Sequence, residues 1–328
     1  MPYARHANAR LYYEVMGDPA ATQMLFIGGF SAQIVGWQKE FCQLFVERGF
    51  RVIRFDNRDV GLSQQFDGTG GNEPGYTLHN MADDGFAIFD ELGITRAHIV
   101  GQSMGGMIAQ CMASARPERV TSLTLVYTAP LISVQFLPPL AEVGEMNFGR
   151  RERAEFIDYI LDQQRANASS VYPFEEEWVR EFAETSYDRA HTPEGVVRQL
   201  QAMLTDLGSS FADAARLTMP VVLIHGTDDA NVHVSASIEL ARRIAHAEVH
   251  LYPGMKHFVV KPLWQEFRDT IVRTARRADR ELAGIETAVA LPQAGQDAAT
   301  DRRAADSQLD IARRSSTRAG RWQAAHSI

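Results

Sequence analysis

The sequence predicts an α/β fold in which helices cover both faces of a mostly parallel sheet. Short apolar runs alternate with segments of helical periodicity along most of the chain, and this alternation is typical of parallel strands joined by helices. Several apolar runs end in glycines or polar loops, as buried strands do. Residues 131–215 contain no convincing strand. We therefore expect a sheet of about eight strands with a helical cap inserted after the sixth strand.

The strands and helices can be assigned in chain order. Residues 3–17 are expected to form an antiparallel hairpin that turns near Asn8. Further strands are expected at residues 23–30, 51–56, 97–103, 123–130, 221–229 and 248–257. Between and after them, helical spacing of apolar residues predicts helices at 37–48, 77–93, from 104 onward, 235–244 and 257–277.

Three parts of the chain differ in composition. Residues 1–130 and 216–278 carry the strand and helix pattern of the core. Residues 131–215 contain helical patterns such as RRERAEFIDYILDQQR and the aromatic-rich VYPFEEEWVREFAETSY. A helical insertion between two strands is expected to cover their carboxyl ends, where ligands bind in parallel sheets. Residues 279–328 hold few large apolar side chains, so we expect a disordered or loosely helical tail.

The composition argues against several classes of protein. Of the 328 residues 45% are hydrophobic, enough for one large core or a core with an inserted sub-domain. No run approaches the ~20 consecutive apolar residues of a membrane helix, and the opening MPYARHANAR lacks the apolar stretch of a signal peptide. We therefore expect a cytoplasmic protein without a membrane span.

Charge and cysteine content argue against other partners. The net charge of −8 disfavours nucleic acid, because proteins that bind it carry basic stripes. Two cysteines, Cys42 and Cys111, are too few for a disulfide framework, and no Cys/His spacing resembles a zinc site, so no metal is expected. The sequence leaves the oligomeric state open, and a homodimer is one of the alternatives.

The strongest chemical signal is the sequence Gly101-Gln102-Ser103-Met104-Gly105. A G-x-S-x-G pattern is common by chance, but here an apolar strand precedes it and an apolar helix follows it. That context is typical of a strained strand-to-helix turn that exposes a nucleophilic serine. The glycines avoid clashes with the neighbouring backbone, so Ser103 is the candidate nucleophile.

A serine hydroxyl is a poor nucleophile unless a base removes its proton. In this arrangement the base follows the last strand, where Pro253-Gly254-Met255-Lys256-His257 stands. We therefore expect His257 to be the general base. His233, in a loop near the candidate acids, is its main rival among the ten histidines.

The base also needs a carboxylate that fixes its tautomer and supports its developing charge. The strand at 221–225 runs into Gly226-Thr227-Asp228-Asp229, a tight turn with two acids. Only one of them can face His257, and the other is expected to be a turn residue that binds its own backbone. The alternative position, after the strand at 123–127, carries no carboxylate.

Hydrolysis further requires hydrogen-bond donors for the oxyanion. The backbone amide of Met104, directly after the candidate nucleophile, is one expected donor. The other is expected in the loop Gly28-Gly29-Phe30-Ser31, whose glycines allow the backbone to approach substrate closely. We assign it to the Phe30 amide and expect Gly29 to contact substrate.

Residues 1–278 resemble the α/β-hydrolase superfamily, and especially small-ester hydrolases near the aclacinomycin and rhodomycin methylesterases and the actinobacterial carboxylesterases. The matching segments are FIGGF, RFDNRDVGLS, VGQSMGGMIAQ, IHGTDDANVHV and YPGMKHF. The resemblance implies that Asp229, three residues after the glycine of H-G-x-x-D, is the acid, and that no cofactor is needed. The family usually has histidine where Gly28 stands and often proline where Ala230 stands. Neither departure removes a backbone donor or a triad member.

The sequence therefore predicts a serine hydrolase that cleaves a small-molecule ester through an acyl-enzyme. Candidates to line the pocket between sheet and cap, or else to form the core of the cap, are Phe30, Phe136, Tyr172, Phe174 and Trp178. An apolar lining implies a small or medium substrate with an apolar acyl or alcohol part. The alternatives are a carbon–carbon bond hydrolase of ring-cleavage products, a cofactor-free perhydrolase or haloperoxidase, and a non-enzymatic receptor or scaffold.

Overall fold

The computed structural model describes residues 2–66, 75–130, 134–136, 148–206 and 214–285. The chain divides into two compact units, Met1–Ala278 and Asp279–Ile328. Within the second unit residues 279–285 are helical. The prediction for the remainder of the tail, from residue 286 onward, lies outside the described residues.

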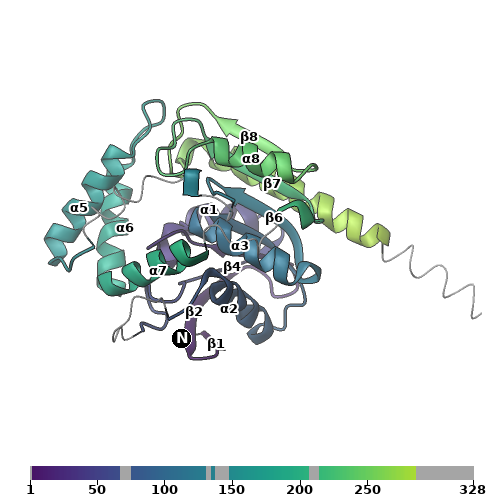
Figure 1. Ribbon diagram of the computed structural model, residues 1–328, viewed down its shortest axis with the longest axis horizontal. Coiled ribbons are helices and arrows are strands. Elements are labelled where there is room, and N and C mark those ends of the chain that lie inside the picture. The colour runs from purple at the N-terminus through teal and green to yellow at the C-terminus, as the bar shows by residue number, and fades with distance from the viewer. Residues whose placement is uncertain (1, 67–74, 131–133, 137–147, 207–213, 286–328) are drawn as a thin grey trace, which may run out of the picture. The chain divides into compact units, whose positions relative to one another are not determined.

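The first unit is built on one eight-stranded sheet in the order β1-β2-β4-β3-β5-β6-β7-β8 (Figure 1). Its first two strands pair antiparallel, as do β2 and β4, and every other neighbouring pair is parallel. The strands are β1 Tyr3–His6, β2 Ala9–Met16, β3 Thr22–Ile27, β4 Phe50–Phe55, β5 Ala97–Gln102, β6 Val120–Val126, β7 Val221–Gly226 and β8 Glu248–Tyr252. The predicted fold class is confirmed, including the opening hairpin.

The helices cover both faces of the sheet because alternate strand residues point to opposite faces. In β3, Leu25 and Ile27 belong to one buried apolar cluster and Met24 and Phe26 to the other. The first cluster includes side chains of α2, α3 and α8; the second includes those of α1 and of the helix that follows residue 263. The labelled helices are α1 Lys39–Val46, α2 Leu78–Glu91, α3 Met104–Ala115 and α8 Ser235–Arg243. Short 3-10 turns lie at Ile34–Gly36, Pro117–Arg119, Val134–Phe136, Ala214–Arg216 and Lys261–Leu263.

The described part of the insertion between β6 and β7 is helical, as predicted. Its helices are α5 Arg153–Ala166, α6 Glu176–Arg189 and α7 Pro193–Asp206, which lie to one side of the sheet in Figure 1. A small cluster around Ile157, Leu161, Val179 and Ala183 packs α5 against α6. The cap therefore has its own apolar contacts in addition to those with the core.

The loop after β4, residues 56–63, holds the cap on the core through buried ion pairs. We name it the acidic loop. Its Asp59 carboxylate is inaccessible to solvent and accepts two hydrogen bonds from Arg198 of α7, at 2.7 and 2.9 Å. Its Asp56 carboxylate is equally buried and binds Arg189 of α6. Both carboxylates also accept backbone amides, so their charges are balanced inside the protein.

Candidate active site

Ser103 lies at a sharp turn between β5 and α3. Its backbone has φ 53° and ψ −124°, a conformation that is costly for a residue with a side chain. The turn is also crowded. A Cβ atom at Gly101 would lie 2.3 Å from the Gly105 carbonyl oxygen, and one at Gly105 would lie 2.3 Å from the Ile27 carbonyl oxygen. The close approach of backbone to backbone explains why glycine flanks the serine on both sides.

The structure brings Ser103, His257 and Asp229 into one chain of contacts. Ser103 Oγ lies 3.0 Å from His257 Nε2, and His257 Nδ1 lies 2.7 Å from Asp229 Oδ2. With a proton on Nδ1 donated to the carboxylate, Nε2 is free to accept the serine proton. The arrangement can therefore move a proton away from Ser103.

Asp229 is held as a carboxylate. Burial on its own would raise its pKa, but hydrogen bonds from His225, from His257 and from the Val232 amide outweigh that effect and hold the pKa well below the usual range. The carboxylate also accepts the Asn231 and Val232 amides, each at 2.9 Å. It therefore stays negative and fixed in orientation beside the imidazole.

The rival acid and rival base lie elsewhere. Asp228 is exposed and accepts a hydrogen bond from the neighbouring Thr227 hydroxyl at 2.7 Å. His233 is exposed and its Nδ1 lies 2.7 Å from Ser235 Oγ. His225 is fully buried and binds Ser237 and the Val232 carbonyl, with its Nε2 also 3.4 Å from Asp229.

The two expected oxyanion donors flank the serine. Met104 is the first residue of α3, where backbone amides lack partners within the helix. The loop that carries Phe30 runs beside the serine, since a Cβ atom at Gly29 would lie 3.2 Å from Ser103 Cβ. Within the described chain, neither the Phe30 nor the Met104 amide donates to another residue. Both amides are therefore available to a bound oxygen.

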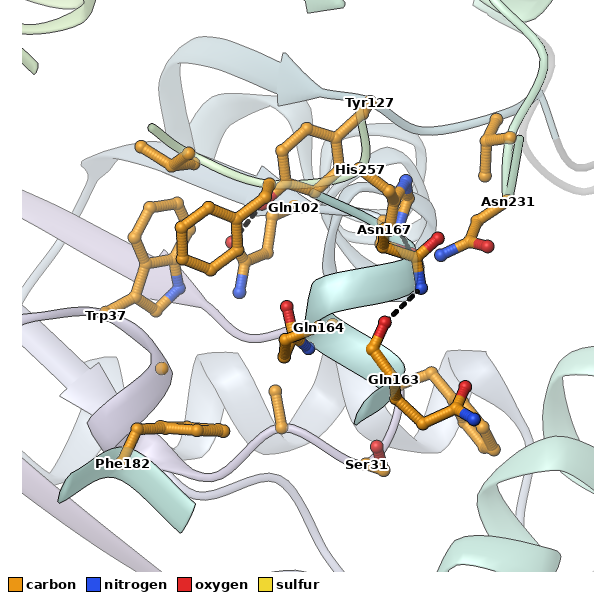
Figure 2. A pocket seen from close by; sticks show the side chains of 18 of the residues that line it. Ser31, Trp37, Gln102, Tyr127, Gln163, Gln164, Asn167, Phe182, Asn231 and His257 are labelled. Atoms are coloured by element: carbon orange, nitrogen blue, oxygen red, sulfur yellow. Dashed lines mark hydrogen bonds between the residues drawn. The ribbon is translucent and has the colours of Figure 1, made fainter. Parts of the chain in front are cut away.

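A cavity of about 380 Å³ opens onto Ser103 and His257 (Figure 2). Helices α5, α6 and α7 of the cap supply one part of its wall, and the loops after β3 and β8 supply another. Apolar side chains that line it include Trp37, Phe41, Trp178, Phe182, Phe258 and Trp264. The cavity therefore has the size and lining of a site for a small apolar molecule.

The structure divides the predicted lining residues into two groups. Gly29, Phe30 and Trp178 line the cavity. Three others lie outside it, so the prediction that they contact substrate is not supported. Phe136 packs in the apolar cluster of α2 and α3, Tyr172 packs against the opposite cluster, and Phe174 packs within the cap. These aromatic side chains have apolar partners to bury against, which sequence composition does not reveal.

Several polar lining residues were not predicted. On the cap, Tyr159, Gln163 and Gln164 of α5 and Asn167, the residue after that helix, line the cavity, and on the core Gln102 does so. Tyr159, Gln163 and Asn167 follow one another at intervals of four positions and so share one face, with Gln164 next to Gln163, but the sequence does not show which face meets the core. Gln102 had a usable signal, since it directly precedes the candidate nucleophile.

No group of three or more His, Cys, Asp or Glu side chains within the described ranges is arranged to hold a metal ion. None of the helices in the described chain combines the length and apolar character that a bilayer crossing requires. Cys42 and Cys111 are both buried and free.

Known proteins resemble this chain in sequence and in structure. Rhodomycin D methylesterase DnrP of Streptomyces peucetius is 28% identical over 272 residues, which covers 75% of this chain and 88% of the methylesterase. The enol-lactonase of Burkholderia xenovorans superimposes with a TM-score of 0.65 at 22% identity, covering 83% of this chain and 99% of the lactonase. The 2-hydroxy-6-oxo-6-phenylhexa-2,4-dienoate hydrolase of Rhodococcus superimposes with a TM-score of 0.64 at 18% identity, covering 84% and 97%.

A match of a family model to most of the chain shows the family. The family model described as alpha/beta hydrolase fold matches residues 23–262, which include all three members of the hydrogen-bonded chain and the cap. The eight-stranded sheet, the strained serine turn and this match agree with one another. The chain belongs to the α/β-hydrolase family.

Proposed function

We propose that the protein hydrolyses an uncharged carboxylic ester with a small or medium apolar part, through an acyl-enzyme on Ser103. The observation that carries the proposal is the chain of contacts from Ser103 Oγ through His257 to Asp229, at 3.0 and 2.7 Å, at the floor of an apolar cavity. An ester-acting hydrolase also agrees with the methylesterase relative.

In the first half of the reaction the Ser103 oxygen attacks the ester carbonyl while His257 Nε2 takes the hydroxyl proton. The tetrahedral intermediate collapses, the carbon–oxygen bond to the alcohol breaks, and His257 returns the proton to the leaving alcohol. In the second half His257 takes a proton from water, which attacks the acyl carbonyl. This second intermediate collapses, the bond between the acyl carbon and Ser103 Oγ breaks, and His257 returns the proton to Oγ as the acid leaves.

The backbone amides of Phe30 and Met104 are proposed to bind the oxyanion of each tetrahedral intermediate. Fixed backbone donors stabilise the charge that develops there, and each contributes roughly 3 kcal/mol in related chemistry. The support here is that both amides lack acceptors in the described chain and lie on either side of Ser103.

The lining of the cavity argues for an uncharged substrate. Among its described residues there is no Lys, Arg, Asp or Glu, and amide side chains supply much of its polarity. A buried anion without a cationic partner is costly. The Rhodococcus structural neighbour is named for a dienoate, which is an anion. The missing cation therefore favours ester hydrolysis over the cleavage of carbon–carbon bonds in such carboxylates.

A fluorophosphonate probe tests the serine directly. We expect the purified full-length chain to be labelled and Ser103→Ala to resist labelling, because the probe reacts with an activated serine hydroxyl. Ser235→Ala is the matched control, since Ser235 also lies 2.7 Å from a histidine, His233, but on the exposed surface. A wild-type chain that resists the probe, or a Ser103→Ala chain that retains the label, would defeat the proposal.

A substrate panel tests the reaction class. We expect turnover of p-nitrophenyl esters of short and medium acyl chains, and little or no cleavage of a ring-cleavage diketone that carries a carboxylate. Peroxide-dependent halogenation in acetate is measured beside them, because it would reveal a perhydrolase. Faster cleavage of the diketone than of every ester would replace this proposal with the carbon–carbon hydrolase alternative.

A further inference from the structure

The residue before the candidate nucleophile, Gln102, has a defined orientation in the wall of the cavity. It is nine-tenths buried and lines the cavity beside Ser103. Its Oε1 accepts a hydrogen bond from the Tyr127 hydroxyl at 2.6 Å. The structure gives its Nε2 no acceptor within the described residues. One end of the amide is thus fixed, and the other end offers two N–H groups to the cavity.

Tyr127 is built to hold Gln102 in that orientation. It follows the last residue of β6 and has φ 35°, a conformation that costs energy for a bulky side chain. Its ring packs against the His257 ring, with centroids 4.4 Å apart. Complete burial and the nearby Asp229 charge raise the pKa of its phenol, so the hydroxyl keeps its proton and acts as a donor. Gln102 must therefore present oxygen to Tyr127 and nitrogen to the cavity.

A second donor lies in the same wall. Trp37 is 2% exposed and lines the cavity, and its Nε1–H has no hydrogen-bond partner within the described residues. Its ring is fixed by stacking on Phe41 at 6.0 Å and by edge contact with Phe26 at 5.0 Å. Figure 2 shows its nitrogen on the side of the ring that faces the Gln102 amide nitrogen. A buried donor without an acceptor is costly, and a bound oxygen would remove that cost.

We infer that the Gln102 and Trp37 side chains form a donor subsite for a second, uncharged oxygen of the substrate. The inference rests on the proposed ester hydrolysis and narrows its substrate class to esters with a further acceptor near the scissile carbonyl, such as a ketone or a second ester carbonyl. Donors that make no hydrogen bond within the described residues select for oxygen and against a methylene group at that position.

The subsite is suited to a neutral oxygen rather than to a carboxylate. A carboxylate would accept the same N–H groups, but among the described cavity-lining residues there is no Lys or Arg to balance its charge. The ionised Asp229, beyond the His257 ring, would add repulsion. A keto or ester carbonyl makes the hydrogen bonds without either penalty.

Matched esters that differ by one oxygen test the subsite. The acyl side is probed with methyl levulinate against methyl pentanoate, and the alcohol side with acetonyl acetate against propyl acetate. We expect kcat/KM of the wild-type enzyme to favour the oxygenated ester of at least one pair by about tenfold, the effect of a hydrogen bond to an otherwise unpaired buried donor. Monomethyl succinate, which carries a carboxylate, is expected to be a poorer substrate than methyl levulinate.

Variants assign the preference to the subsite. In Gln102→Met, which keeps the length but removes the donors, the preference is expected to fall to within about twofold of unity. In Tyr127→Phe, which releases the amide, it is expected to fall part of the way. Gln164→Met, another amide removed from the same cavity, is expected to keep the ratio. A ratio changes only if the residue distinguishes the two esters, so loss of stability alone does not imitate this result.

The outcomes separate this inference from the proposed function. An enzyme that takes the fluorophosphonate label and hydrolyses both members of each pair equally is an esterase without the subsite, and the inference is overturned. An unchanged preference in Gln102→Met, or a preference for monomethyl succinate, overturns it as well. Failure to take the label defeats the proposed function instead.

Discussion

Gln199 of the cap helix α7 accepts a hydrogen bond from the Ser31 backbone amide at 3.0 Å. The same side chain is fully buried and donates to the Arg58 carbonyl at 2.8 Å. Ser31 directly follows Phe30, the expected oxyanion donor, and Arg58 belongs to the acidic loop. One amide side chain therefore connects the cap, the acidic loop and the loop that is proposed to bind the oxyanion.

Replacing Gln199 by Met is expected to lower kcat about tenfold or more, with a smaller change in KM. The Phe30 amide would lose its fixed position, and oxyanion stabilisation depends on donors that are already in place. Unfolding in urea should also show a loss of about 1–3 kcal/mol, because the buried Arg58 carbonyl and the Ser31 amide would lose their hydrogen-bond partner. Gln201→Met, a half-buried residue of the same helix outside the cavity, is the control. An equal loss of kcat in both variants would contradict the role of Gln199.

The buried pair of Asp59 and Arg198 makes a second prediction. Arg198→Met should reduce the free energy of unfolding by about 3–5 kcal/mol, because it leaves a buried carboxylate without its cation. Arg150→Met removes an ion pair with Glu194 in which both side chains are more than half exposed, so it should cost less than about 1 kcal/mol. Urea denaturation of the three chains measures both values, and similar losses would show that the acidic loop does not hold the cap.

The serine turn gives a prediction about Gly101. Gly101→Ala places a methyl group 2.3 Å from the Gly105 carbonyl oxygen, and the backbone must move to relieve the clash. Overpacking of a rigid interior costs about 1–3 kcal/mol, and a shift of the turn would also displace Ser103. We expect a lower thermal midpoint and a large loss of esterase activity. Gly75→Ala, where the added methyl group meets no atom within 4 Å, should resemble the wild type in both measurements.

The low pKa of Asp229 predicts how stability depends on pH. A carboxyl group whose pKa is lower in the folded protein adds stability above its unfolded pKa of about 3.9, and that stability is lost as the pH falls below it. The free energy of unfolding of the wild type, measured in urea, should exceed that of Asp229→Asn by about 1 kcal/mol less at pH 3 than at pH 6. Asp228→Asn, which changes the exposed neighbour, should show no such dependence. A constant advantage across this range would contradict the pKa assigned to Asp229.

Much of the fold was predictable because the signals are local. Apolar runs predicted every strand of the parallel part of the sheet, but not every limit. β6 begins at Val120, three residues before its predicted start at residue 123. β8 ends at Tyr252, five residues before its predicted end at residue 257. Ends are harder to predict because hydrogen bonding to a neighbouring strand decides them. The hairpin at the start was predicted from alternation and from the turn near Asn8.

The cap was predictable as helical but not in its orientation. Its helical periodicity shows where α5 to α7 lie in the sequence, whereas the contacts of Arg189 and Arg198 with the acidic loop decide which faces meet the core. For the same reason the sequence could not show which aromatic residues of the cap line the cavity and which pack against other side chains. Trp178 lines the cavity, while Phe174 packs beneath the Arg165 side chain.

The sequence by itself predicted the serine turn, because the G-x-S-x-G pattern between an apolar strand and an apolar helix is local, and the crowding at Gly101 comes from Gly105 and Gly106, a few residues along the chain. It also predicted His257 as the base from its place after the last strand, and resemblance to a family predicted Asp229 as the acid. Only the tertiary structure decided how the proposed donors are held. The hydrogen bonds from Tyr127 to Gln102 and from Ser31 to Gln199 join residues 25 and 168 positions apart, and such contacts depend on how strands and cap pack rather than on any local pattern.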